Sequence, residues 1–89
     1  MASRQIVHKE HHYTDNKKLW TDYQYNDGAT KTIDYDANGK TLLTTWIIDY
    51  DTYVYNCDNV LIRHSSVNPF FEKIYNDRGE LVYGSLAKI

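Results

Sequence analysis

The segment Tyr35-Asp-Ala-Asn-Gly-Lys-Thr-Leu42 recurs twice further along the chain at a spacing of 20 residues. The later copies are Tyr55-Asn-Cys-Asp-Asn-Val-Leu-Ile62 and Tyr75-Asn-Asp-Arg-Gly-Glu-Leu-Val82, and a looser copy begins at Tyr13. The three copies at this spacing each have a tyrosine, a polar turn with Gly or Asn at the fifth position, and then apolar residues. We interpret each copy as a β-hairpin in which the tyrosine ends one strand and an apolar residue opens the next. The repetition indicates one supersecondary unit used about four times, with the tyrosine and the apolar residue paired across the strands.

The remainder of the sequence carries the same β signature. Turn-forming residues recur every eight to twelve positions, which is typical of a meander built from hairpins. Thr, Tyr, Ile, Val and Trp are abundant, and these residues fit a pleated sheet better than a helix. The pattern predicts about eight short strands, near residues 5–13, 18–25, 30–35, 41–48, 52–55, 60–65, 70–75 and 80–86. We expect one all-β domain, residues 1–89, formed by a single antiparallel meander as either a curled sheet or a partial barrel.

Length and composition exclude several classes of protein. The chain has 89 residues, with 10 Lys and Arg against 12 Asp and Glu, which fits one domain of net charge −2. This charge does not favour a nucleic-acid binder, and an aromatic content of 15% does not fit a disordered tail. The single cysteine, Cys57, excludes a disulfide scaffold, and no apolar run approaches the roughly 20 residues of a membrane helix. Because the first residues contain no hydrophobic signal core, we expect a cytoplasmic protein. From the net charge and the lack of a long apolar run, we expect that it binds neither nucleic acid nor a membrane.

Residues 35–83 resemble families of short aromatic repeats. The core of tyrosine–aspartate repeats, Tyr-Asp-x-x-Gly, is matched by Tyr35, Asp36 and Gly39. The same segment is similar to the MORN-variant repeats of some bacterial antitoxin proteins. The resemblance implies a fold of repeated β-hairpins.

A third resemblance is to the cell-wall and glucan-binding repeats of Gram-positive bacteria and their phages. Thr45-Trp46 stands where those repeats carry their tryptophan, and Tyr53-Val54-Tyr55 stands where they carry an aromatic pair. Thr45 replaces the glycine that precedes the tryptophan in that family, Asn59 replaces the glycine of the next unit, and the later units lack tryptophan. This family shares the same hairpin chemistry, and its resemblance implies a module that binds carbohydrate.

Two clusters contain the residue types of metal sites, and in both a structural role is favoured. The run Asp34-Tyr-Asp-Ala-Asn-Gly39 matches the opening of an EF-hand calcium loop, but Thr45 at the twelfth position cannot supply a bidentate carboxylate. His8, Glu10 and His12 share one face of a strand and could hold zinc, but neighbours on that face are about 7 Å apart. We expect a hairpin turn and a solvated polar strand at these places, with no metal and no cofactor.

The sequence contains no catalytic constellation that we recognise. Cys57 has no histidine at a defined spacing, and neither a Gly-x-Ser-x-Gly elbow nor a phosphate loop occurs. The aspartate pairs are interpreted as turn formers, because a sheet of this length offers little cleft to exclude water. We therefore expect a protein that is not an enzyme.

The distribution of charge along the chain is the main guide to function. Residues 22–58 carry seven aspartates against Lys31 and Lys40, a net charge of −5, and they are rich in tyrosine. An acidic field steers basic partners, and tyrosine is a preferred interface anchor. We therefore expect a protein-binding module, such as a small bacterial or phage inhibitor or immunity-type protein, that covers a basic surface of its target. The residues expected to bind the partner are Asp22, Tyr23, Tyr25, Asp27, Asp34, Tyr35, Asp36, Asp49, Tyr50, Asp51 and Tyr53.

An alternative function is carbohydrate or cell-wall binding through exposed aromatic rings. Trp20, Trp46, Tyr53 and Tyr55 are the residues expected to stack on a sugar or a quaternary ammonium group. The exposed edges and the thin core of a small sheet also favour a homodimer or docking onto another protein.

Overall fold

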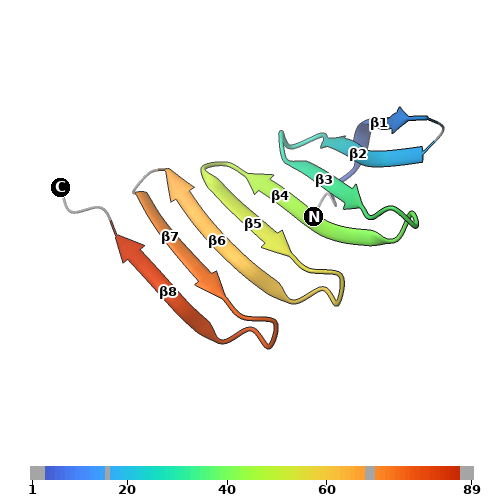
Figure 1. Cartoon of the computed structure of the whole chain (residues 1–89). Coiled ribbons are helices and arrows are strands. Elements are labelled where there is room, and N and C mark those ends of the chain that lie inside the picture. Colours follow the sequence, from blue (N-terminus) through green and yellow to red (C-terminus); the bar gives the residue numbers. More distant parts are fainter. Residues whose placement is uncertain (1–3, 16, 68–69, 87–89) are drawn as a thin grey trace.

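The computed structural model describes residues 4–15, 17–67 and 70–86. The described chain is all-β, and its eight strands form one antiparallel sheet in which each strand pairs with its neighbours in sequence (Figure 1). The strands are β1 (Ile6–Thr14), β2 (Lys17–Tyr25), β3 (Thr30–Tyr35), β4 (Thr41–Ile48), β5 (Asp51–Tyr55), β6 (Leu61–Val67), β7 (Phe70–Tyr75) and β8 (Leu81–Leu86). This order confirms the predicted meander, and the predicted ranges of β3, β4 and β7 coincide with the observed bounds.

The sheet is open at both ends. β1 forms one edge and β8 the other, so the strands do not close into a barrel, and the curled sheet is the form that the described chain adopts (Figure 1). Figure 1 shows a single twisted layer of strands. Across the described ranges, no helix has the length and the apolar character needed to cross a membrane.

The three repeated hairpins share one turn chemistry. The second residue of each repeat is an Asp or Asn whose side-chain oxygen accepts hydrogen bonds from the backbone N–H groups two and four residues later. The distances are 2.8 and 3.0 Å at Asp36, and 2.9 and 3.0 Å at both Asn56 and Asn76. The backbone N–H of the same three residues donates to the carbonyl four positions later at 2.9 to 3.0 Å. The sequence repeat is therefore also a structural repeat.

The fifth position of each repeat adopts the left-handed backbone conformation. Its φ angle is 81° at Gly39, 63° at Asn59 and 80° at Gly79. Glycine enters this region without steric cost and asparagine tolerates it, which explains why these two residues occupy the position. Asp34 and Tyr35 thus end strand β3, and the hairpin turn expected in this segment begins at Asp36.

Each repeat also contains a β-bulge. The pairing register shifts just before each tyrosine, and the extra residue on the following strand is Leu42, Ile62 or Val82. Bulges increase the local right-handed twist, so the repeated shift contributes to the twist of the sheet. Each tyrosine pairs with the residue that opens the next strand, and this residue is apolar in two of the three hairpins, as predicted. The pairs are Tyr35–Thr41, Tyr55–Leu61 and Tyr75–Leu81.

The core is small and partly polar. Within the described ranges, the buried hydrophobic residues are Tyr25 and Ala29. Thr21 of β2 is fully buried, and its hydroxyl lies 2.7 Å from Nδ1 of His11 and 3.0 Å from the hydroxyl of Tyr35. These hydrogen bonds satisfy the buried hydroxyl, so the most deeply buried side chain of the described residues belongs to a cross-strand polar contact between β1, β2 and β3.

Candidate binding surface

Strand alternation gives the sheet two faces, and residues paired directly across neighbouring strands lie on the same face. One continuous line of such pairs places side chains of seven strands, β1 to β7, on one face, and the pairing ends at Gly84 of β8, which has no side chain. We call this line the aromatic row, and we call the face that carries it the aromatic face. The aromatic row consists of Lys9, Tyr23, Lys31, Trp46, Tyr53, His64 and Lys73.

The first half of the aromatic row alternates cations with rings. The Nζ atoms of Lys9 and Lys31 lie 5.4 and 4.6 Å from the ring centroid of Tyr23. Lys31 also lies 5.1 Å from the ring centroid of Trp46. These distances are in the range of cation–π attraction, so Lys31 links two aromatic rings within the segment that is most acidic in sequence.

Trp46 is the centre of a second cluster on this face. Its ring stacks on Tyr25 with 5.2 Å between centroids, and Cζ of Arg4 lies 5.6 Å from the Trp46 centroid. Nε of Arg4 also donates to a carboxylate oxygen of Asp27 at 2.7 Å. This hydrogen bond, followed by one from the backbone N–H of Ala29, lowers the pKa of Asp27 below its usual value. Arg4, which precedes β1, is therefore held against the aromatic face.

An open cavity of about 210 Å³ lies beside Trp46. Its lining combines flat aromatic rings, one aliphatic side chain and one guanidinium group. A site of this shape could accept one ring or one large side chain, and the guanidinium could donate hydrogen bonds to it. The lining residues are Arg4, Trp46, Ile48, Tyr53 and Tyr55.

The second half of the aromatic row is organised around His64. Its ring stacks on Tyr53 at 4.3 Å and meets the edge of Phe71 at 4.9 Å. Nε2 of His64 lies 3.1 Å from a carboxylate oxygen of Asp51. Partial burial, followed by the nearby charge of Asp51, raises the pKa of Tyr53 above its usual value of 10.0. Tyr53 therefore stays neutral and offers its ring and hydroxyl at physiological pH.

The opposite face has a polar cluster at its amino-terminal end. The carboxylate of Asp22 accepts hydrogen bonds from Thr32 at 2.9 Å and Trp20 at 3.2 Å, and it lies 2.9 Å from Nε2 of His12. Partial burial opposes the ionisation of Asp22, but these hydrogen bonds together outweigh it and lower its pKa. Trp20 stacks on His12 at 4.3 Å, so its ring is already covered on one side.

The histidine-rich strand β1 was one candidate for a metal site. Oε2 of Glu10 lies 3.7 Å from Nε2 of His8 and 4.0 Å from Nε2 of His12. Among the described residues, no group of three or more His, Cys, Asp or Glu side chains has an arrangement that could hold a metal ion. The interaction of His12 with Asp22 is shorter, at 2.9 Å, and indicates a cross-strand polar contact.

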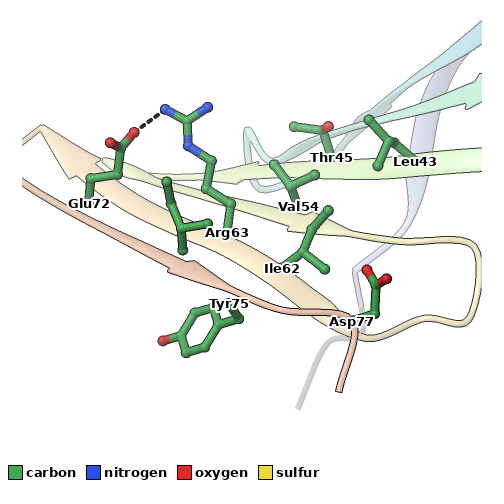
Figure 2. Close-up of a pocket in the computed structure, with 9 residues that line it drawn as sticks. Leu43, Thr45, Val54, Ile62, Arg63, Glu72, Tyr75 and Asp77 are labelled. Atoms are coloured by element: carbon green, nitrogen blue, oxygen red, sulfur yellow. Dashed lines mark hydrogen bonds and ion pairs between the residues drawn. The ribbon is translucent and has the colours of Figure 1, made fainter. Parts of the chain in front are cut away.

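The carboxyl-terminal half of the opposite face carries a shallow groove of about 520 Å³. Figure 2 shows that Val54 and Ile62 project from this side of the sheet beside the ion pair between Arg63 and Glu72, while Tyr75 projects from the other side. The groove is lined largely by aliphatic side chains, whereas the aromatic face carries cations and aromatic rings. Its lining residues are Leu43, Thr45, Val54, Ile62, Arg63, Glu72, Ile74, Tyr75 and Asp77.

The aspartates of the expected partner-binding set do not share one surface. Asp22 and Asp34 lie on the opposite face, because they pair with Thr32 and Leu43 across the strands. Other members lie in turns at the two ends of the strands, and several of the carboxylates accept local hydrogen bonds. The members in turns are Asp27, Asp36, Asp49 and Tyr50.

The remaining members of that set lie on the aromatic face. They are Tyr23, Tyr25, Tyr35, Asp51 and Tyr53. In the alternative set, Trp46, Tyr53 and Tyr55 lie together around one cavity, whereas Trp20 lies on the opposite face.

Sequence reasoning missed the basic members of the aromatic face. The basic side chains that lie within 5.6 Å of an aromatic ring centroid there are Arg4, Lys9, Lys18, Lys31 and Lys73. The detectable signal was the two-residue connection between β4 and β5, which pairs Trp46 with Tyr53. Extending that register strand by strand would have led to the lysines and to His64.

No family model, curated protein or solved structure matches the chain. The likeness to short aromatic repeats stays a prediction from the sequence, and the geometry of the two faces carries the functional argument.

Proposed function

We propose that the protein is a non-enzymatic binding module that recognises another protein through its aromatic face. The observation that supports this proposal is the aromatic row, which spans seven strands of a single-layered sheet. Tyrosine, tryptophan and arginine are the residues that most often carry interface energy, and this face brings them together around one cavity. A small inhibitor or immunity-type protein of bacterial or phage origin is the concrete form that we propose, and we place its activity in the cytoplasm.

The charge of the face favours a partner that differs from the one expected from sequence. A basic target surface was expected because residues 22–58 are acidic. The aspartates are divided between two faces and two ends of the sheet, whereas five cations lie against rings of the aromatic face. We therefore propose a partner that presents carboxylates around an aromatic or aliphatic side chain, which would enter the cavity beside Trp46.

Capture of the partner from its host, followed by calorimetry with variants, tests this proposal. Lys31→Glu reverses one charge between Tyr23 and Trp46, and we expect it to weaken partner binding by about tenfold or more. Trp20→Phe alters the opposite face and is the matched control, with binding expected to stay within about twofold of the wild type. Equal affinity of Lys31→Glu and the wild type, with an unchanged circular dichroism spectrum, contradicts recognition through the aromatic face.

Carbohydrate binding is a second candidate, favoured by the three aromatic rings and the guanidinium around the same cavity. Rings of this kind stack on sugars, and Arg4 could donate to hydroxyl or carboxylate oxygens. The chain has two tryptophans, so Trp20→Phe leaves Trp46 as the single tryptophan reporter. A shift of Trp46 fluorescence with glucan oligomers or choline would support this function, and a flat titration with both argues against it.

A further inference from the structure

The two edges of the sheet differ in their ability to accept another strand. β1 has the charged and ionisable run His8 to His12 and register shifts at both ends, features that protect an edge from pairing. β8 has the sequence Leu-Val-Tyr-Gly-Ser-Leu, without a charge or a proline. In the described chain β8 pairs with β7 alone, and Leu81, Val82 and Tyr83 are 58%, 61% and 50% exposed. An apolar, uncharged edge of this kind is a template for strand addition.

The repeat shows what is missing at this edge. β8 is the third copy of the strand that follows the repeated turn, and the other copies, β4 and β6, each pair on both sides. The backbone N–H and C=O groups of β4 and β6 form hydrogen bonds with a neighbouring strand on each side. In the described chain, the backbone groups of β8 have a neighbouring strand on one side, which is β7. A strand added there would complete the same pattern.

We propose that the free edge of β8 pairs antiparallel with β8 of a second copy, so that two chains form one continuous sheet of sixteen strands. The charges of the two edges favour a second copy of the chain as the partner of β8. Self-pairing of β8 brings no like charges together, because the strand carries none. Self-pairing of β1 about its centre would place Glu10 opposite Glu10 of the second copy, which is unfavourable.

The proposed symmetry closes the assembly. Pairing β8 with β8 is isologous and ends at two chains, whereas pairing β8 with β1 of the next copy would extend without limit. Antiparallel pairing turns the second copy about an axis perpendicular to the sheet, so both aromatic faces lie on the same side. The dimer would then present two aromatic rows to one target, but the dimer itself does not depend on the proposed function.

Substitution of Gly84 tests the edge with little risk to the fold. Gly84 lies opposite Lys73 in β7, and a Cβ atom at Gly84 would meet nothing within 4 Å. In the monomer, the glutamate side chain of Gly84→Glu has room and lies opposite the cation Lys73. In the dimer, the same substitution places one carboxylate from each copy at the shared edge, where they repel each other. Gly84→Thr adds a β-branched residue without charge, and Val7→Glu places the same charge on the β1 edge, where Val7 is 64% exposed.

Analytical ultracentrifugation over a range of concentrations is the measurement. We expect a dimer for the wild type, Gly84→Thr and Val7→Glu, and a dimer Kd raised by about tenfold or more for Gly84→Glu, with unchanged circular dichroism spectra for all four. A wild type that stays monomeric near millimolar concentration overturns the proposal. A dimer unaffected by Gly84→Glu overturns it as well and would indicate pairing through a face. Masses that grow beyond the dimer with concentration contradict it in favour of β8 pairing with β1.

Discussion

At the scale of single residues, the fold depends on a few positions whose chemistry is local. Gly39 and Gly79 hold left-handed backbone conformations at the ends of the repeated turns, and Asn59 does the same with a side chain. Gly84, in β8, has no such requirement. Glycine therefore has a conformational role in the repeated turns, whereas β8 does not require it at position 84.

Gly39→Ala is expected to destabilise the protein by about 1–2 kcal/mol, because an L-residue is strained at a φ of 81°. The site is otherwise open, so the cost is conformational and not steric. Gly84→Ala, the matched control, should leave the stability unchanged or slightly higher. Urea unfolding of the two variants at low protein concentration measures both values, and equal losses would show that the left-handed turn is not the cause.

His11 gives the protein a predicted dependence of stability on pH. Desolvation, followed by the charges of Lys18 and Lys9, lowers the pKa of His11 below its ordinary value of 6.5. The folded state therefore binds this proton less tightly than the unfolded state, and the free energy of unfolding falls as the pH drops below 6.5. Between about pH 7.5 and about pH 5.5, the wild type should lose more stability than His11→Gln in urea unfolding. An equal loss in both proteins would assign the pH dependence to other groups.

At the scale of elements, the hairpin is the unit that the chain repeats. In each unit, one Asp or Asn side-chain oxygen accepts hydrogen bonds from two backbone N–H groups of the turn, and one residue has the left-handed backbone conformation. A β-bulge follows in the next strand. All three features recur at a spacing of 20 residues. Because each feature lies within one hairpin, the geometry of each turn is specified locally, whereas its stability depends on pairing with the neighbouring strands.

Asn56→Ala is expected to cost about 1–2 kcal/mol, since it removes the acceptor for the backbone N–H groups of Asp58 and Val60. Cys57 lies in the same turn with an exposed side chain, so Cys57→Ala should change the stability by less than about 0.5 kcal/mol. Thermal or chemical denaturation of both variants provides the measurement. If Asn56→Ala leaves the free energy of unfolding unchanged, water replaces the side-chain oxygen as the acceptor without loss of stability.

At the scale of the whole molecule, the sheet is a chain of nearest-neighbour contacts. Every strand contacts the strands next to it in sequence, and no other pair of strands has substantial contacts in the described chain. Proteins of this kind behave as quasi-one-dimensional arrays, in which the end units open more easily than the middle. We therefore expect the aromatic face to be most rigid at its centre, around Trp46.

Amide hydrogen exchange should show this gradient. The amides of β7 and β8 are expected to exchange faster than those of β3 to β5 at low protein concentration, because β8 is an edge strand. If β8 pairs with a second copy, its protection should rise with protein concentration while that of β4 stays constant. Uniform exchange across all strands would contradict the picture of separable hairpins.

The strands and turns could be predicted from the sequence because their causes are local. Gly39 and Asn59 indicate a left-handed position at the fifth residue of each repeat, and β-branched and aromatic residues fill the strands between turns. Strand bounds near β6 and β8 were displaced by one or two residues, because strand ends depend on pairing partners from other hairpins. The open form of the sheet also depends on the sum of all twists and bulges, which no single hairpin specifies.

The sequence by itself determined the hairpins, their order and the all-β class, because these follow from turn chemistry and alternation within about 20 residues. Only the tertiary structure decided which residues share a face. Adjacent residues on a strand point to opposite sides, so a net charge of −5 along residues 22–58 did not become one acidic surface. Asp22 and Tyr23 are neighbours in sequence but face opposite ways, whereas Lys9, Trp46 and Lys73 lie in one row because the register of seven strands aligns them.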